Sequence, residues 1–144
     1  MSVKQISVFL ENRPGTLERM TGALSAAGVD MRALSLAETK DFGIARMVVD
    51  DAMSAVNVLK DADFVASLTS VLVVEIPDEV GGLNKLLAHF TETGVNIEYM
   101  YAFLGGSSSN ASYMIFRVAD TDAAEAKLAK RGLKLLSQED IAGI

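Results

Sequence analysis

The sequence contains no cysteine, no tryptophan and one histidine among its 144 residues. Without cysteine the chain forms no disulfide, has no thiol nucleophile and cannot bind zinc through thiolates. The single histidine, His89, lies out of phase with the apolar stripe of its predicted helix and has no Cys or second His as a partner. We therefore expect no metal site, no cofactor and no catalytic residues. The lack of cysteine is compatible with a reducing cytoplasm.

Long apolar runs and basic stretches are also missing. No apolar segment reaches the roughly 18 residues that a membrane-spanning helix needs, and the first residues lack the regions of a signal peptide. Lys and Arg form no basic patch, the net charge is −6, and six Phe and three Tyr are the only aromatic residues. These features argue against nucleic acid and membrane partners and favour a cytoplasmic protein.

What the sequence does have is an internal repeat. The residues that recur at one fixed offset are Leu17, Met20, Leu24, Gly28 and Asp30 in the first half, and Leu83, Leu86, Phe90, Gly94 and Asn96 in the second. Because the repeat keeps both an apolar helix stripe and the glycine that follows it, it predicts two copies of one small domain. We place the copies at residues 1–70 and 71–144.

Each copy is predicted to run β-α-β-β-α-β. For the first copy we expect strands at 3–10, 30–38, 44–49 and 64–69 and helices at 16–27 and after Asp51. For the second we expect strands at 72–76, 96–104, 113–118 and 133–136, a helix after Gly82 with Leu83, Leu86, Leu87 and Phe90 as its stripe, a helix at 120–130 and a polar loop at 105–110. Residues 137–144 have no predicted structure. The fold class is therefore α+β, with two ferredoxin-like βαββαβ domains whose antiparallel sheets pack side by side and carry helices on one face.

The turns from first strand to first helix are the candidate sites. A glycine there lets a ligand approach the backbone, and the free N–H groups of the first helical turn attract an anion such as a carboxylate. Asn12 and Asp30, at neighbouring strand ends, would accept from an ammonium group at the same corner, as would Asp78 and Asn96 in the second copy. The alternative is that Gly15 and Gly82 only permit a tight turn.

The segment from Glu11 to Leu17, Glu-Asn-Arg-Pro-Gly-Thr-Leu, followed by Gly28-Val-Asp-Met31, resembles the turn and strand pattern of ACT domains. The resemblance covers roughly residues 3 to 137 and extends to the small stand-alone tandem ACT proteins. ACT domains bind amino acids at interfaces between paired domains and regulate metabolic enzymes.

The resemblance implies two sets of ligand-binding residues. The first set is Asn12, Arg13, Pro14, Gly15, Thr16, Leu17, Asp30 and Met31. The second set is Asp78, Glu79, Val80, Gly81, Gly82, Leu83, Asn96 and Ile97. Val80 stands where Pro is usual, and Asp78 with Glu79 would repel a carboxylate unless the backbone amides dominate. We therefore expect unequal sites, with the first turn as the better candidate.

Together these patterns predict a non-catalytic regulatory protein that senses an amino acid at ACT-domain interfaces. The expected partners are the amino acid, a second copy of the chain in a homodimer, and a metabolic enzyme. The alternative is a regulatory or interaction subunit of an enzyme of amino-acid metabolism, with a vestigial ligand site.

Overall fold

The computed structural model describes residues 2–38, 40–103 and 111–144 of the chain. It divides into two compact units, an N-terminal unit of residues 4–69 and a C-terminal unit of residues 70–144 with the start of the chain. The polar loop predicted at 105–110 lies outside the described residues. No helix in the described part of the chain is long and apolar enough to span a membrane.

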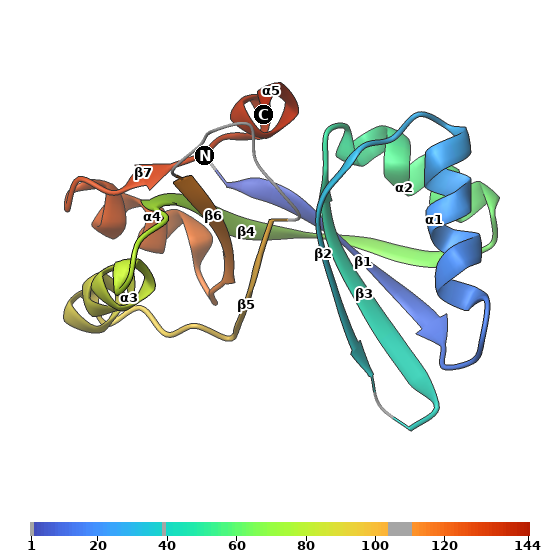
Figure 1. Ribbon diagram of the computed structural model, residues 1–144, viewed down its shortest axis with the longest axis horizontal. Coiled ribbons are helices and arrows are strands. Elements are labelled where there is room, and N and C mark those ends of the chain that lie inside the picture. The colour runs from blue at the N-terminus through green and yellow to red at the C-terminus, as the bar shows by residue number, and fades with distance from the viewer. Residues whose placement is uncertain (1, 39, 104–110) are drawn as a thin grey trace. The chain divides into compact units, whose positions relative to one another are not determined.

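The N-terminal unit is a four-stranded sheet with two helices (Figure 1). Its elements are β1 (Val3–Glu11), α1 (Thr16–Ala26), β2 (Met31–Glu38), β3 (Phe42–Val49), α2 (Ala52–Asp61) and the start of β4 (Val65–Pro77). The strand order is β2-β3-β1-β4. β3 runs antiparallel to both of its neighbours, with Leu10 opposite Gly43 and Leu34 opposite Met47.

Alternation along the strands and helical spacing in α1 and α2 place one apolar face of each element in a common core. The core of the N-terminal unit joins Ile6, Val8 and Leu10 of β1 to Met20 and Leu24 of α1 and to Ala55 and Leu59 of α2. Asp51 begins α2, and its side chain accepts from the Ser54 N–H at 3.1 Å. This bond satisfies one of the donors that every helix start leaves open.

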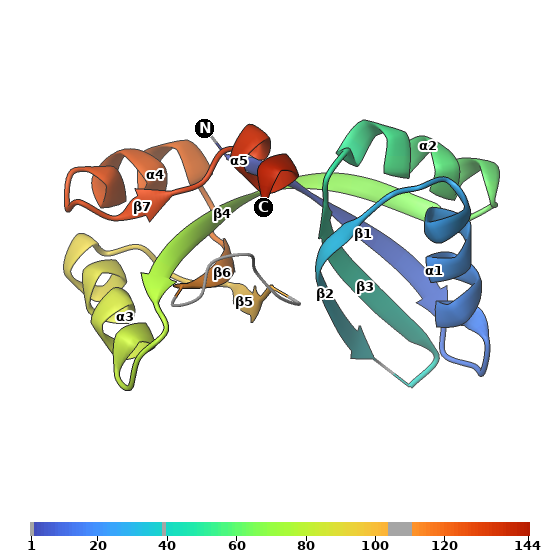
Figure 2. The same ribbon diagram turned by 45° about the horizontal axis from the view of Figure 1, so that its top comes forward.

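The C-terminal unit repeats the arrangement. Its elements are the end of β4, α3 (Gly82–Thr93), β5 (Tyr99–Ala102), β6 (Ala111–Arg117), α4 (Thr121–Ala129), β7 (Lys134–Leu135) and α5 (Gln138–Gly143). β4 pairs antiparallel with both β6 and β7, and β5 pairs with β6. Figure 2 shows α3 and α4 on one side of these strands. Leu86 and Phe90 of α3 and Leu128 of α4 form a core with Leu72, Val74 and Phe116 of the sheet.

Three elements differ from the sequence-based expectation. The strands expected at 64–69 and 72–76 are one strand, β4, because no Gly or Pro interrupts Thr69-Ser-Val71. β5 is shorter than the predicted strand 96–104. The unassigned tail forms α5, which begins with a capping box in which the Ser137 and Asp140 side chains each bind the other's backbone N–H. The hydrogen bonds from Ser137 lower the pKa of the Asp140 carboxyl.

A polar ladder crosses the sheet of the C-terminal unit. Glu75 lies opposite Tyr113 on β6 and opposite Lys134 on β7. Its carboxylate accepts from the Tyr113 hydroxyl at 3.4 Å and pairs with the Lys134 ammonium. Burial, followed by the charge of Glu75, raises the pKa of Tyr113, and the bond to Glu75 raises the pKa of Lys134.

The helix stripes of the two units are not equally buried. Leu17 is partly buried against the core of its unit, whereas Leu83, its repeat equivalent, is 37% exposed. The expectation that Leu83 belongs to the buried stripe is therefore wrong, and Phe90 is the large anchor of α3.

We predict that Phe90→Ala lowers the free energy of unfolding by about 3–5 kcal/mol, because it empties a buried aromatic site. Leu83→Ala on the same helix is the matched control and should cost less than about 1 kcal/mol. Urea unfolding followed by far-UV circular dichroism measures both. Equal costs for the two variants would contradict the burial described above.

Candidate functional site

The turn that joins β1 to α1 is held by backbone hydrogen bonds. The Asn12 N–H donates to Asp41 O at 3.1 Å, and the Arg13 N–H donates to Glu11 O at 2.9 Å. Gly15 precedes the helix with φ of 87°, and no side chain caps the first turn of α1. The Thr16 N–H donates to Arg13 O at 3.4 Å, so the N–H groups of Leu17 and Glu18 are the ones open to an anion beside the turn.

The turn that joins β4 to α3 has the same backbone. The Glu79 N–H donates to Pro77 O at 3.0 Å and the Lys85 N–H to Gly81 O at 3.0 Å, at the repeat positions of Arg13 and Arg19. Gly81 precedes the helix with φ of 81°. Val80 thus takes the place of Pro14 without changing the turn.

Gly81, and not Gly82, is the counterpart of Gly15. Gly15 and Gly81 have positive φ, and a Cβ added to either would meet no atom within 4 Å. What these two positions require is the left-handed backbone, which L-residues adopt at a cost. Gly82 has a different reason to be glycine, since its Cβ would lie 2.7 Å from the carbonyl oxygen of Pro77.

Two cavities lie beside the first turn. One of about 60 Å³ is lined by Asn12, Arg13, Thr16 and Leu17 together with Leu10, Glu11, Leu36 and Gly43. The other, of about 240 Å³, is lined by Phe9, Leu10, Glu11, Arg13, Thr16, Arg19, Phe42, Asp63, Phe64 and Val65. Of the first predicted set, Asn12, Arg13, Thr16 and Leu17 line these cavities. Pro14 and Gly15 belong to the turn but line neither cavity, and Asp30 and Met31 are not among the lining residues.

Arg13 and Arg19 are the positive side chains of this corner, whose larger cavity is also lined by the acidic Glu11 and Asp63. Arg13 pairs with Glu11 at 3.0 Å, with both side chains mostly exposed. Arg19 donates to the carbonyl oxygen of Ala62 at 3.3 Å and lies 4.2 Å from the centre of the Phe64 ring. Arg19 is not among the residues predicted from the sequence, although its place one helical turn after Gly15 is a usable signal.

Asp30 and Met31 do not join Asn12 at this corner. Glu11, just before Asn12, pairs with Phe42 at the start of β3, whereas Met31 pairs with Val49 at its end. At roughly 3.3 Å per residue, the length of β3 separates the two corners by about 20 Å. Asp30 instead pairs with Arg32 at 3.1 Å, and Met31 packs against the core.

The second predicted set is divided in the same way. Asp78 follows Pro77, which pairs with Ala111 at the start of β6, whereas Asn96 precedes a strand whose Tyr99 pairs with Arg117 at the end of β6. The residues from Asp78 to Leu83 line neither cavity described above. Ile97 packs against the core of its unit. The shared corner predicted for Asn12 with Asp30, and for Asp78 with Asn96, is therefore wrong within one unit.

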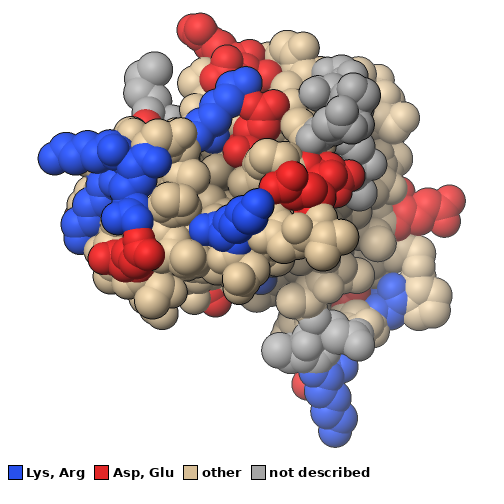
Figure 3. All heavy atoms as spheres, turned by 60° about the vertical axis from the view of Figure 1, so that its left-hand side comes forward, with Lys and Arg blue, Asp and Glu red and all other residues tan. Residues whose placement is uncertain are grey.

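The second turn is also less suited to an anion. Glu79 stands where the first copy has Arg13, and it pairs with Lys85 at 3.1 Å. On the face shown in Figure 3, acidic and basic side chains are interspersed. Two further ion pairs of this unit join Arg131 to Glu92 and Arg117 to Glu98. Among the described residues, no group of three or more acidic or histidine side chains is arranged to hold a metal ion.

Comparison with known proteins decides the family. The family described as ACT domain pair matches residues 1–144. The chain belongs to the ACT domain pair family. Protein BT0572 from Bacteroides thetaiotaomicron is 34% identical over 100% of this chain and 98% of its own, with a TM-score of 0.91. A search of the curated proteins finds no match.

Two solved structures share the fold of this ACT domain pair at lower identity. The regulatory subunit of aspartate kinase from Thermus thermophilus, in its ligand-free form, is 17% identical, with a TM-score of 0.62 over 90% of this chain and 93% of its own. The regulatory subunit from Thermus flavus is 20% identical, with a TM-score of 0.61 over 90% of each chain. At these identities the likeness shows the fold alone.

The glycine geometry leads to a graded prediction. Gly15→Ala and Gly81→Ala should each cost about 1 kcal/mol through the left-handed backbone. Gly82→Ala should cost more, because its Cβ would clash with Pro77 O. Gly22→Ala, at an open position inside α1, is the control and should stabilise by roughly 0.5–1 kcal/mol. Urea unfolding tests the order, and a harmless Gly82→Ala would overturn it.

Proposed function

We propose that this ACT domain pair is a non-catalytic regulatory protein that senses an α-amino acid, with the turn from Asn12 to Leu17 as the carboxylate site. The observation that carries the proposal is the uncapped start of α1 after Gly15, flanked by Arg13 and Arg19. Free helical N–H groups and guanidinium groups are donors that suit a carboxylate. The two domains proposed are residues 1–70 and 71–144.

Arg13 supports this role because its present partner is easily exchanged. The Arg13–Glu11 pair lies at the surface, and exposed ion pairs contribute only about 0–1 kcal/mol. A ligand carboxylate that also binds the helix N–H groups would replace Glu11 at small cost. Arg19 is the more fixed of the two, because the carbonyl oxygen of Ala62 and the ring of Phe64 hold it.

The ammonium group of the amino acid calls for a second unit. Within one unit, the acidic Asp30 and the first turn lie at opposite ends of the strands. A site that combines the first turn of one unit with Asp30 or Asn96 of another would supply donors for the carboxylate and acceptors for the ammonium group. We therefore propose that the ligand binds at an interface between ACT domains, either within one chain whose sheets pack side by side or in a homodimer.

A regulatory protein without catalytic residues acts on a partner. Solved relatives of the same fold are regulatory subunits of aspartate kinase, which supports an enzyme of amino-acid metabolism as the partner proposed here. The absence of cysteine fits a cytoplasmic location. The second candidate is a regulatory subunit whose ligand site is vestigial, and the acidic residues of the second turn favour it for that copy.

A thermal-shift screen against the twenty amino acids tests the proposal. One or a few of them should raise the melting temperature in a concentration-dependent way, because a ligand that binds only the folded state stabilises it. No shift at millimolar concentrations would reject the sensor and favour the vestigial subunit.

Charge-reversal variants locate the site. Arg13→Glu gives the first turn the residue of the second and should abolish the shift, as should Gly15→Asp. Glu79→Arg is the matched control at the second turn and should leave the shift in place. If Arg13→Glu keeps the full shift while Glu79→Arg changes it, the first turn is not the carboxylate site.

A further inference from the structure

Three large apolar side chains are exposed at one end of the sheet of the N-terminal unit. Phe9, Phe42 and Val65 are 53%, 56% and 67% exposed, and all three line the cavity of about 240 Å³ beside the first turn. Phe9 lies opposite Ile44, and Phe42 lies opposite Glu11. Both phenylalanines are therefore on the face of the sheet away from the helices. Large apolar side chains gathered in one exposed patch are typical of a binding site, whereas single ones need no explanation.

The second copy shows that the fold does not require an apolar patch at this end. Glu75 stands at the repeat position of Phe9, and Lys134 stands at that of Val65. The two lie opposite each other on β4 and β7 and form an ion pair. The same sheet positions thus carry charges in one copy and exposed apolar side chains in the other. Because exposed apolar surface is unfavourable in water, the patch of the first copy points to a role beyond the fold.

Two observations support this match of positions. Phe42 begins β3 and Ala111 begins β6, so the third large side chain of the patch corresponds to a small one. Asp63 and Gly132 each precede the last strand of their copy by two residues, and both have positive φ, of 66° and 79°. The chain therefore enters the two last strands along the same path.

A buried hydroxyl in the same cavity lacks a hydrogen-bond partner. Thr16 is only 9% exposed, and it lines both cavities beside the first turn. Among the described residues, its hydroxyl forms no hydrogen bond, and it is not sealed from solvent. Since buried polar groups are normally hydrogen-bonded, a hydroxyl left open to a cavity suits a polar group of a ligand. The repeat position of Thr16 is Gly82, which has no hydroxyl.

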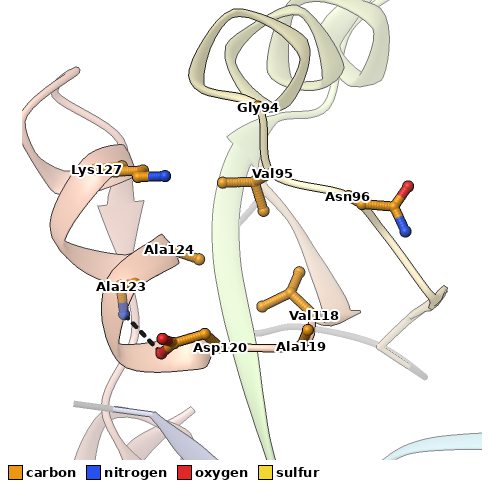
Figure 4. Close-up of a pocket in the computed structure, with 9 residues that line it drawn as sticks. All are labelled: Gly94, Val95, Asn96, Val118, Ala119, Asp120, Ala123, Ala124 and Lys127. Carbon is orange, nitrogen blue, oxygen red and sulfur yellow. Dashed lines mark hydrogen bonds between the residues drawn. The ribbon is translucent and has the colours of Figure 1, made fainter.

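A groove of similar volume in the C-terminal unit has neither feature. It measures about 250 Å³, and Figure 4 shows Val95 and Val118 at its centre and the Asn96 side chain pointing away. None of the described residues that line it is aromatic. The Asp120 carboxylate there already accepts from the Ala123 N–H at 3.0 Å. Volume alone thus does not distinguish the two, and the apolar patch with an open hydroxyl belongs to the first copy.

The charged residues around the first cavity balance one another. Glu11 pairs with Arg13, Arg19 lies over the Phe64 ring, and Asp63 adds a second carboxylate. With two acidic and two basic side chains, the cavity has no net charge that would select a charged ligand side chain. A zwitterion with an apolar side chain matches this balance, because it is neutral as a whole and has an apolar part for the patch.

We propose that this cavity takes the side chain of a large apolar amino acid, such as leucine, isoleucine, methionine or phenylalanine. The inference rests on the proposed function, which places the ligand carboxylate at the first turn. The Thr16 hydroxyl donates to that carboxylate, and the ligand side chain lies against Phe9, Phe42 and Val65. A cavity of roughly 150 Å³ holds benzene, so one of about 240 Å³ has room for such a side chain.

A homologous series of amino acids tests the chemical class. In isothermal titration calorimetry of the full chain, 2-aminobutyrate, norvaline and norleucine should bind roughly fourfold more tightly for each added methylene, because each leaves water. Leucine should bind roughly tenfold or more tightly than asparagine, which has a similar shape and a polar end. If amino acids bind but their affinity does not follow the apolar chain, the inference is wrong and the proposed function stands. Binding by none of them rejects both.

Variants separate the side-chain cavity from the carboxylate site. Phe9→Glu combined with Val65→Lys copies the ion pair of the second copy, so it should keep the fold and remove the preference for leucine over asparagine. Met53→Ser changes another exposed apolar side chain of the same unit and is the matched control, which should keep the preference. Thr16→Val keeps the shape of the residue and should weaken leucine and alanine equally, roughly tenfold, through the lost hydrogen bond to a charged group.

Sedimentation equilibrium of the ligand-free protein tests the other occupant of the patch, a second copy of the chain. If the double variant loses a dimer that the unchanged chain forms and still prefers leucine, the patch joins two copies and the inference is overturned. Equal effects of the double variant and Met53→Ser on leucine binding would overturn it as well.

Discussion

In each unit the first and second strands are parallel, and the helix between them brings the chain back from the end of the first to the start of the second. The layout of the candidate sites depends on this crossover. Because α1 runs back along the sheet, the end of β1 and the start of β2 lie at opposite ends of the strands. Asn12 is therefore near Gly43, and Asp30 is near Asp50. A ligand with a carboxylate and an ammonium on one carbon cannot span the length of these strands, so it cannot reach both ends of one sheet. The fold thus separates the two halves of the predicted site and makes a second unit necessary for an amino-acid site built from both.

The two turns show how a backbone persists while its side chains change. The left-handed glycines at 15 and 81 and the hydrogen bonds at equivalent positions keep the same path. That path needs a residue tolerant of positive φ and little else, so Pro14 and Val80 are interchangeable in it. The charges are not constrained by the path, and Arg13 in one turn corresponds to Glu79 in the other. The donors of the helix start are common to both turns, but the first adds two arginines to them, whereas the one lysine of the second, Lys85, pairs with Glu79.

The sequence predicted the elements whose signals are local. The stripe Ala52, Ala55, Val56 and Leu59 and its cap at Asp51 lie in α2 as expected, because helical spacing and a capping side chain are both local features. Leu83 shares the helical spacing of Leu86 and Phe90, so its spacing alone did not reveal that it is 37% exposed. Ser137 and Asp140 have the spacing of a capping box, but no apolar helical stripe follows them, so the sequence did not predict α5.

For the sites, the sequence led to the first turn but not to what surrounds it. Glu11 to Leu17 could be recognised as a turn from Pro14 and Gly15, and the structure gathers most of these residues around two cavities. Arg19 and Phe64 were missed because their contact joins α1 to the residues before β4. The prediction that Asn12 and Asp30 share a corner is wrong for a topological reason. The end of one strand and the start of the next are close in a hairpin, but here a helix joins them and places them at opposite ends of the sheet.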